Sequence, residues 1–268
     1  MTQVIPMQTY RYGDSAGQEG DLHLPGTPCP PVVALLHGGF WRIPYGREEM
    51  EAAARDLAGR GFAVWNIEYR RCGAPGGGWP GTLQDVAAAI DHLAVLAAGG
   101  VELDLDHVIA AGHSAGGHLA LWAAGRARSD ARVFRPPQVP VRAAAGLAPV
   151  SDLAAAHALG LGRSAVAEFL GGSPVQVPER YRACSPIEML PLNLPHLIVH
   201  GAEDEAVPVM LSRAYANAAR AAGDAVDLAE LGDVNHMDVI NPHSVAYAVF
   251  CQWLSKICSS PSHSRPDV

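Results

Sequence analysis

The sequence predicts an α/β fold with a doubly wound, mostly parallel sheet that helices cover on both faces. Short apolar runs without polar alternation recur along the 268 residues, and parallel strands buried on both faces have this composition. Longer helix-like segments separate these runs, as right-handed crossovers in a parallel sheet require. The length suits one domain, which we place at residues 1–258, followed by a disordered tail at 259–268.

The expected strands fall into a parallel group and two outer segments. The segment GDLHLPG, residues 20–26, is expected as an antiparallel strand at the edge of the sheet. Residues 225–233 are expected as the last strand. The parallel strands, each a short apolar run, are expected at residues 32–37, 62–68, 108–111, 143–147 and 197–200.

Helix-like segments lie between these strands, and several of them begin or end at proline or glycine. Residues 152–190 break the alternation of strand and helix. We expect short helices there, inserted between two strands as a small lid. The main helices are expected at residues 47–60, 82–98, 115–126, 208–222 and 242–257.

Composition and charge argue against several classes of function. The formal net charge is −8, which argues against nucleic acid and anionic membranes as partners. No apolar run reaches the roughly 18 residues of a membrane span, and the N-terminus lacks a secretory pattern, so we expect a cytoplasmic protein. No C-x-x-C pair occurs, so reduced thiols are expected rather than a metal site. The five cysteines are Cys29, Cys72, Cys184, Cys251 and Cys258.

Ser114 lies in the pattern G-x-S-x-G at residues 112–116, between a buried strand and a helix. A nucleophile elbow requires this strand–turn–helix context. Small neighbours permit the sharp turn, and a helix N-terminus favours developing negative charge. The alternative is a surface turn whose small residues serve packing. The context favours Ser114 as a nucleophile.

A second loop follows the first parallel strand and reads HGGFWR. Its glycines free the backbone to aim N–H groups at the oxyanion that forms during acyl transfer. We expect the donors to be the N–H groups of Gly39 and Phe40, together with that of Ala115. Trp41 is expected to line the substrate pocket. The alternative is a glycine turn in which Phe40 and Trp41 fill the core.

A third loop, after the strand at 197–200, carries the carboxylates of Glu203, Asp204 and Glu205. One of them is suited to orient a catalytic histidine, and Asp204 is our choice because it precedes a helix start. The alternative is an acidic helix start exposed to solvent, where carboxylates are favoured in any case.

The fourth loop carries His236, which follows the last strand in a polar segment. A histidine there suits a general base that works near neutral pH. It comes after Ser114 and Asp204, in the chain order Ser, Asp, His of this architecture. Other histidines lie on or beside predicted strands or helices and are expected to be structural: His37, His113, His118 and His200.

The stretches HGGFW, GHSAGGHLA, HGAEDEAVP and NHMDVI together resemble the α/β-hydrolase superfamily. The resemblance is closest to esterase- and lipase-like members with an HGG oxyanion loop, including the kynurenine formamidase (arylformamidase) group. It implies an eight-stranded sheet. It also implies a triad of Ser114, Asp204 and His236, with Gly39, Phe40 and Ala115 as oxyanion donors.

The sequence therefore favours a serine hydrolase that cleaves small carboxylic esters, with no metal or organic cofactor. The thin lid, rich in alanine and glycine, favours short acyl groups. An arylformamidase that hydrolyses N-formylkynurenine is the first alternative, and a peptidase ranks lower. A non-catalytic homologue that binds a small molecule is an alternative of another class. The expected partner is a small ester or formamide, and the sequence leaves the oligomeric state open.

Overall fold

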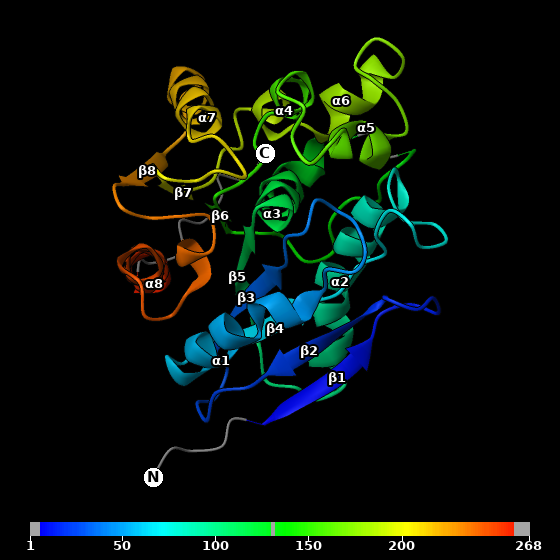
Figure 1. The fold of residues 1–268 in the computed structure, drawn as a ribbon. Coiled ribbons are helices and arrows are strands. Elements are labelled where there is room, and N and C mark those ends of the chain that lie inside the picture. Colours follow the sequence, from blue (N-terminus) through cyan, green and yellow to red (C-terminus); the bar gives the residue numbers. More distant parts are fainter. Residues whose placement is uncertain (1–5, 130–131, 260–268) are drawn as a thin grey trace.

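The computed structural model describes residues 6–129 and 132–259, and within them eight strands form one sheet (Figure 1). Their order across the sheet is β1-β2-β4-β3-β5-β6-β7-β8. The β1–β2 and β2–β4 pairs are antiparallel, and every later pair is parallel, which confirms the predicted sheet. The strands are β1 Met7–Arg11, β2 Glu19–His23, β3 Pro31–Leu36, β4 Ala63–Ile67, β5 Asp104–His113, β6 Ala143–Leu147, β7 His196–Gly201 and β8 Val226–Leu231.

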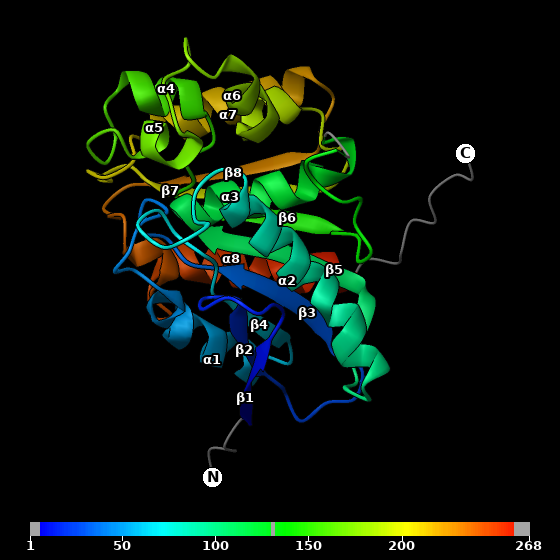
Figure 2. The ribbon, with the colours of Figure 1, turned by 90° about the vertical axis from the view of Figure 1, so that its right-hand side faces the viewer.

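Helices cover both faces of the sheet, so the central strands have no polar face (Figures 1 and 2). In β3, Val32 and Leu36 pack into the core on one face, whereas Val33 and Leu35 pack into the core on the other. Helices α1 Glu51–Gly59 and α8 Val245–Ser259 cover one face. The other face is covered by α2 Gly81–Ala98, α3 Ala115–Gly125 and α7 Met210–Ala221.

The expected short helices lie between β6 and β7, within residues 152–190. In both views they lie beside α7 at the top of the molecule (Figures 1 and 2). Their aromatic and apolar side chains join the core on the α2 and α3 face. The elements are α4 Leu153–Ala158, α5 Ala165–Leu170, α6 Pro178–Cys184 and the 3-10 turn η3 Pro186–Met189.

The structure corrects several expectations at the ends of elements. β2 is not the edge strand, because β1 pairs with its outer side. The helix expected at 47–60 consists of a 3-10 turn, η1 Arg47–Met50, followed by α1. Ser259, placed in the tail by the sequence, is the last residue of α8, and the rest of the expected tail, 260–268, lies outside the described residues. Within the described part of the chain, no helix has the length and apolar character to cross a membrane.

Candidate active site

Ser114 sits at the turn from β5 into α3 in a strained backbone conformation. Its φ is 54° and its ψ is −116°, and the residue is only 2% exposed. A non-glycine residue in such a region costs about 1–3 kcal/mol, so the surroundings must hold it there. They do so through close packing: a Cβ at Gly116 would overlap the carbonyl oxygens of Leu36 and His37. The G-x-S-x-G segment thus forms the predicted elbow.

Asp204 and His236, on the loops after β7 and β8, are in direct contact. Oδ2 of Asp204 lies 2.6 Å from Nδ1 of His236. Oδ1 of Asp204 accepts the N–H groups of Ala206 and Val207 at 2.9 and 2.8 Å. Because Asp204 has only oxygen acceptors on this side, Nδ1 of His236 donates and Nε2 is left to accept a proton. This is the geometry that a general base requires.

His236 also lies beside the elbow. Its ring packs against that of His113, which directly precedes Ser114, with 4.5 Å between the ring centroids. Nε2 of His113 donates to the backbone oxygen of His236 at 3.0 Å. The structure therefore brings the predicted acid and base loops to the predicted nucleophile at the carboxyl ends of the parallel strands, where sites in such sheets form.

The charge state of the pair follows from burial and hydrogen bonding. Burial would raise the pKa of Asp204, but hydrogen bonds from His200 and His236 outweigh it and hold that pKa well below its ordinary value. Burial lowers the pKa of His236, and the hydrogen bond to Asp204 only partly opposes this. Asp204 therefore stays ionised, and His236 is neutral near pH 7, ready to accept a proton.

The HGGFW loop follows β3 and has an unusual backbone. Gly39, Phe40 and Trp41 all have positive φ, at 93°, 53° and 56°. Backbone bonds fix this run: the N–H of Arg42 donates to the oxygen of Gly39 at 3.0 Å, and the N–H of Cys72 donates to the oxygen of Trp41 at 2.7 Å. A Cβ at Gly38 would lie 3.2 Å from Cβ of Ser114, so the loop runs directly beside Ser114.

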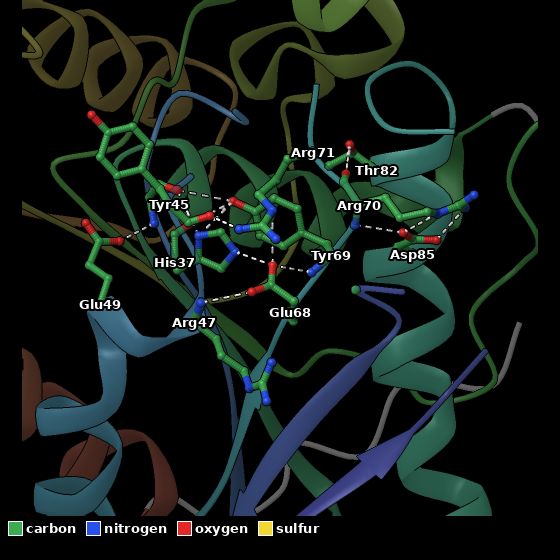
Figure 3. Close-up of polar contacts among 12 residues, drawn as sticks. His37, Tyr45, Arg47, Glu49, Glu68, Tyr69, Arg70, Arg71, Thr82 and Asp85 are labelled. Atoms are coloured by element: carbon green, nitrogen blue, oxygen red, sulfur yellow. Dashed lines mark hydrogen bonds and ion pairs between the residues drawn. The ribbon is translucent and has the colours of Figure 1, made fainter. Parts of the chain in front are cut away.

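His37 at the base of this loop is structural, as expected. Its ring is fully buried and stacks on Tyr69, with 4.2 Å between centroids and 2° between planes. Its Nε2 lies 3.0 Å from Oε1 of Glu68, and the other carboxylate oxygen of Glu68 accepts the N–H of Arg47 (Figure 3). The hydroxyl of Tyr69 donates to the oxygen of His37 at 2.8 Å. This network anchors the start of the loop.

The sequence predicts that Trp41 lines the substrate pocket, and the structure contradicts this prediction. Its side chain has no exposed surface and stacks on Phe169 of α5, with 4.6 Å between centroids. Its Nε1–H donates to Nδ1 of the buried His118 at 3.2 Å. Trp41 has positive φ, and its buried side chain joins α5 to the core. The core alternative holds for this residue.

Sequence reasoning missed two residues that contact the predicted machinery. Glu49 of η1 bonds both the HGG loop and His113, over a separation of 64 residues in the latter case. His200, expected to be structural, also lies 3.1 Å from Oδ2 of Asp204. No local motif marks either contact, because each depends on how distant loops meet. Glu49 carries only the weak signal of an acidic segment just after the HGG loop.

A pocket opens beside Asp204 and His236, and it is lined by residues of the loops after β7 and β8. The lining includes Ala202, Glu203, Asp204, Glu205, Ala206, Asn235 and His236. Among the described residues, no group of three or more His, Cys, Asp or Glu side chains is arranged to hold a metal ion.

The fold and the loops that meet at its strand ends are those of an α/β-hydrolase. The model of the BD-FAE family matches residues 21–218, and the chain belongs to this family. Esterase LipQ of Mycobacterium tuberculosis is 32% identical over 217 residues, which are 77% of this chain and 50% of LipQ. The chain thus spans half the length of that relative.

Solved structures share the fold. A truncated carbohydrate esterase from gut microbiota superimposes with a TM-score of 0.84 at 20% identity, covering 97% of this chain and 99% of the other. Esterase B from Lactobacillus rhamnosis superimposes with a TM-score of 0.81 at 22% identity, covering 96% of this chain and 86% of the other. At these identities the likeness establishes the fold.

Proposed function

We propose that this protein is a serine hydrolase that cleaves small carboxylic esters through an acyl-enzyme intermediate. The observation that carries the proposal is the 2.6 Å contact between Asp204 and His236, on loops that meet the strained Ser114 elbow. A binding protein has no need of a strained serine beside an oriented, neutral histidine. The esterases among its relatives support the same reaction type.

In the proposed reaction, Oγ of Ser114 attacks the acyl carbon while Nε2 of His236 takes the serine proton. The carbonyl oxygen becomes an oxyanion, which accepts hydrogen bonds from the N–H groups of Gly39, Phe40 and Ala115. The N–H of Ala115, first residue of α3, has no partner within its own helix. The alcohol then leaves with the proton from His236. Water repeats the cycle and releases the acid.

A panel of short p-nitrophenyl esters and N-formylkynurenine tests this proposal. Wild type is expected to hydrolyse p-nitrophenyl acetate and butyrate with a higher kcat/KM than N-formylkynurenine. Ser114→Ala, correctly folded by circular dichroism, is the matched control and is expected to be inactive on all of them. A higher kcat/KM for N-formylkynurenine than for the esters would show that the protein is an arylformamidase rather than a carboxylesterase. No turnover of any substrate would favour a binding protein.

A further inference from the structure

The carboxylate of Glu49 lies between two loops of the site. Its Oε2 accepts the N–H of Gly38, in the HGGFW loop, at 2.5 Å. Its Oε1 lies 3.2 Å from Nδ1 of His113, the residue before Ser114. Figure 3 shows Glu49 reaching from η1 to the loop backbone, on the opposite side of His37 from Tyr69. One side chain thus contacts both the proposed oxyanion loop and the nucleophile elbow.

His113 extends this connection to the loop that carries His236. Its Nε2 lies 3.0 Å from the backbone oxygen of His236, and the two rings are in contact. Both ring nitrogens of His113 therefore face acceptors, a carboxylate on one side and a carbonyl on the other. A continuous chain of hydrogen bonds runs from Gly38 through Glu49 and His113 to His236.

Burial makes this chain rigid. His113 is 1% exposed and the Glu49 side chain 18%. Burial would raise the pKa of Glu49, but the contacts with His113 and the hydrogen bond from the Gly38 N–H together outweigh it. The pKa therefore lies below its ordinary value, and the carboxylate stays ionised. Leaving either partner unpaired in such surroundings is costly, so the two side chains hold each other in place.

We propose that Glu49 and His113 form a positioning pair, which fixes the oxyanion loop and the His236 loop relative to Ser114. The inference rests on the proposed function and deepens it. Neither side chain touches substrate. Their effect is on the relative placement of the oxyanion donors and the base, and a displacement of ~1 Å in such groups costs on the order of 10²-fold in rate.

Three substitutions of Glu49 separate position from charge. Glu49→Ala removes the link to both loops. Glu49→Asp keeps the charge but is one methylene shorter, and its carboxylate does not span Gly38 and His113. Glu49→Gln preserves every contact: its oxygen accepts from Gly38, and its amide donates to Nδ1 of a neutral His113, whose Nε2–H still bonds the His236 oxygen.

Glu51→Ala is the matched control. Glu51 also pairs with a buried histidine, at 3.4 Å from Nε2 of His23, and it lies two residues along the chain on α1. Its other ion pair is with Arg55, one turn along the same helix. This control therefore distinguishes the effect of losing any carboxylate–histidine pair from the effect of losing the Glu49–His113 pair.

The readouts are kcat and KM on p-nitrophenyl acetate and the Ki of an alkyl trifluoromethyl ketone, which forms an oxyanion on the serine. We expect Glu49→Ala to lower kcat by about 10²-fold and to raise Ki in parallel, with KM changed less than about 3-fold. The kcat of Glu49→Asp is expected to fall by at least about 10-fold, and the kcat of Glu49→Gln to stay within about 5-fold of the wild-type value. Glu51→Ala is expected to match wild type.

Four outcomes overturn the inference. The first is an active wild type together with unchanged kcat in both Glu49→Asp and Glu49→Ala. This result overturns the positioning pair but leaves the proposed function standing. Equal losses in Glu49→Gln and Glu49→Ala, or in Glu51→Ala and Glu49→Ala, also do so. An inactive wild type overturns both the function and the inference. If Glu49→Ala does not fold, the comparison of Glu49→Asp with Glu49→Gln decides alone.

Discussion

Oδ2 of Asp204 contacts two imidazole rings. It lies 2.6 Å from Nδ1 of His236 and 3.1 Å from Nε2 of His200. The first histidine lies at the site, and the second is fully buried behind it. Nδ1 of His200 is held in turn by the hydroxyl of Ser212 at 2.7 Å. The carboxylate is therefore fixed from the protein interior, and it orients the largely buried His236 at the edge of the pocket.

Asp204→Asn is expected to lower kcat by about 10³-fold or more, because an amide does not hold the useful tautomer of His236. The neighbouring Glu203 is exposed, and Glu203→Gln serves as the control with a loss below about 5-fold. Steady-state kinetics on p-nitrophenyl butyrate give both values. If the two variants behave the other way round, the acid is Glu203.

The pH dependence follows from the state of His236. Burial lowers the pKa of this imidazole, and the base works only when neutral. Activity is therefore expected to rise with pH through one ionisation, with a midpoint below the ordinary histidine value of about 6.5. The measurement is kcat/KM from pH 4 to 9. A profile that is flat throughout, with chemistry limiting, contradicts a histidine base.

Trp41→Ala is expected to destabilise the fold rather than to change substrate preference. The indole is fully buried between Phe169 and His118, and loss of such a side chain costs about 3–5 kcal/mol. The measurement is the urea unfolding midpoint of Trp41→Ala. Tyr45→Ala is the control, because Tyr45 is 53% exposed. Similar unfolding midpoints for the two variants would show that Trp41 does not pack as described.

The preferred length of the acyl group tests the prediction that α4, α5 and α6 form a small lid. Arg42 of the HGGFWR loop ties it down, with Nε 2.6 Å from Glu168 of α5 and a second bond to the oxygen of Gly162. A lid of three short helices held against the loop leaves long acyl chains in water, and each exposed CH₂ forgoes about 0.8 kcal/mol. We expect kcat/KM to peak between acetyl and butyryl esters in a C2 to C12 series. An optimum at C8 or longer contradicts this.

Apolar runs made the parallel strands predictable, because helices bury both faces of the sheet. β6 occupies the predicted residues 143–147, all of them buried. β1 has no such signal, since four of its five residues are exposed at the edge of the sheet. β5 begins at Asp104 rather than at residue 108, where its apolar part starts, because Asp104 pairs with Pro31 before a register shift leads to the pair Val32–Val108.

The site divides in a similar way. Chain order and strand ends were enough to choose Asp204 and His236, because loops after neighbouring parallel strands meet at one edge. The burial of Trp41 depends on a backbone turn and on contact with α5. This helix is distant in the chain: the neighbouring Arg42 bonds Glu168 of α5 across a separation of 126 residues. The bond between Glu49 and His113 likewise depends on tertiary contact alone, so no spacing rule reveals it.

Covalent labelling tests the central claim, that Ser114 is an activated nucleophile, most directly. With a fluorophosphonate, Oγ of Ser114 is expected to bond to phosphorus while fluoride leaves and His236 takes the proton. Intact-mass and peptide spectra should show one adduct per chain, on Ser114, with none in Ser114→Ala and a rate at least about 10³-fold lower in His236→Ala. No adduct in folded wild type, or equal labelling of Ser114→Ala, would contradict the account.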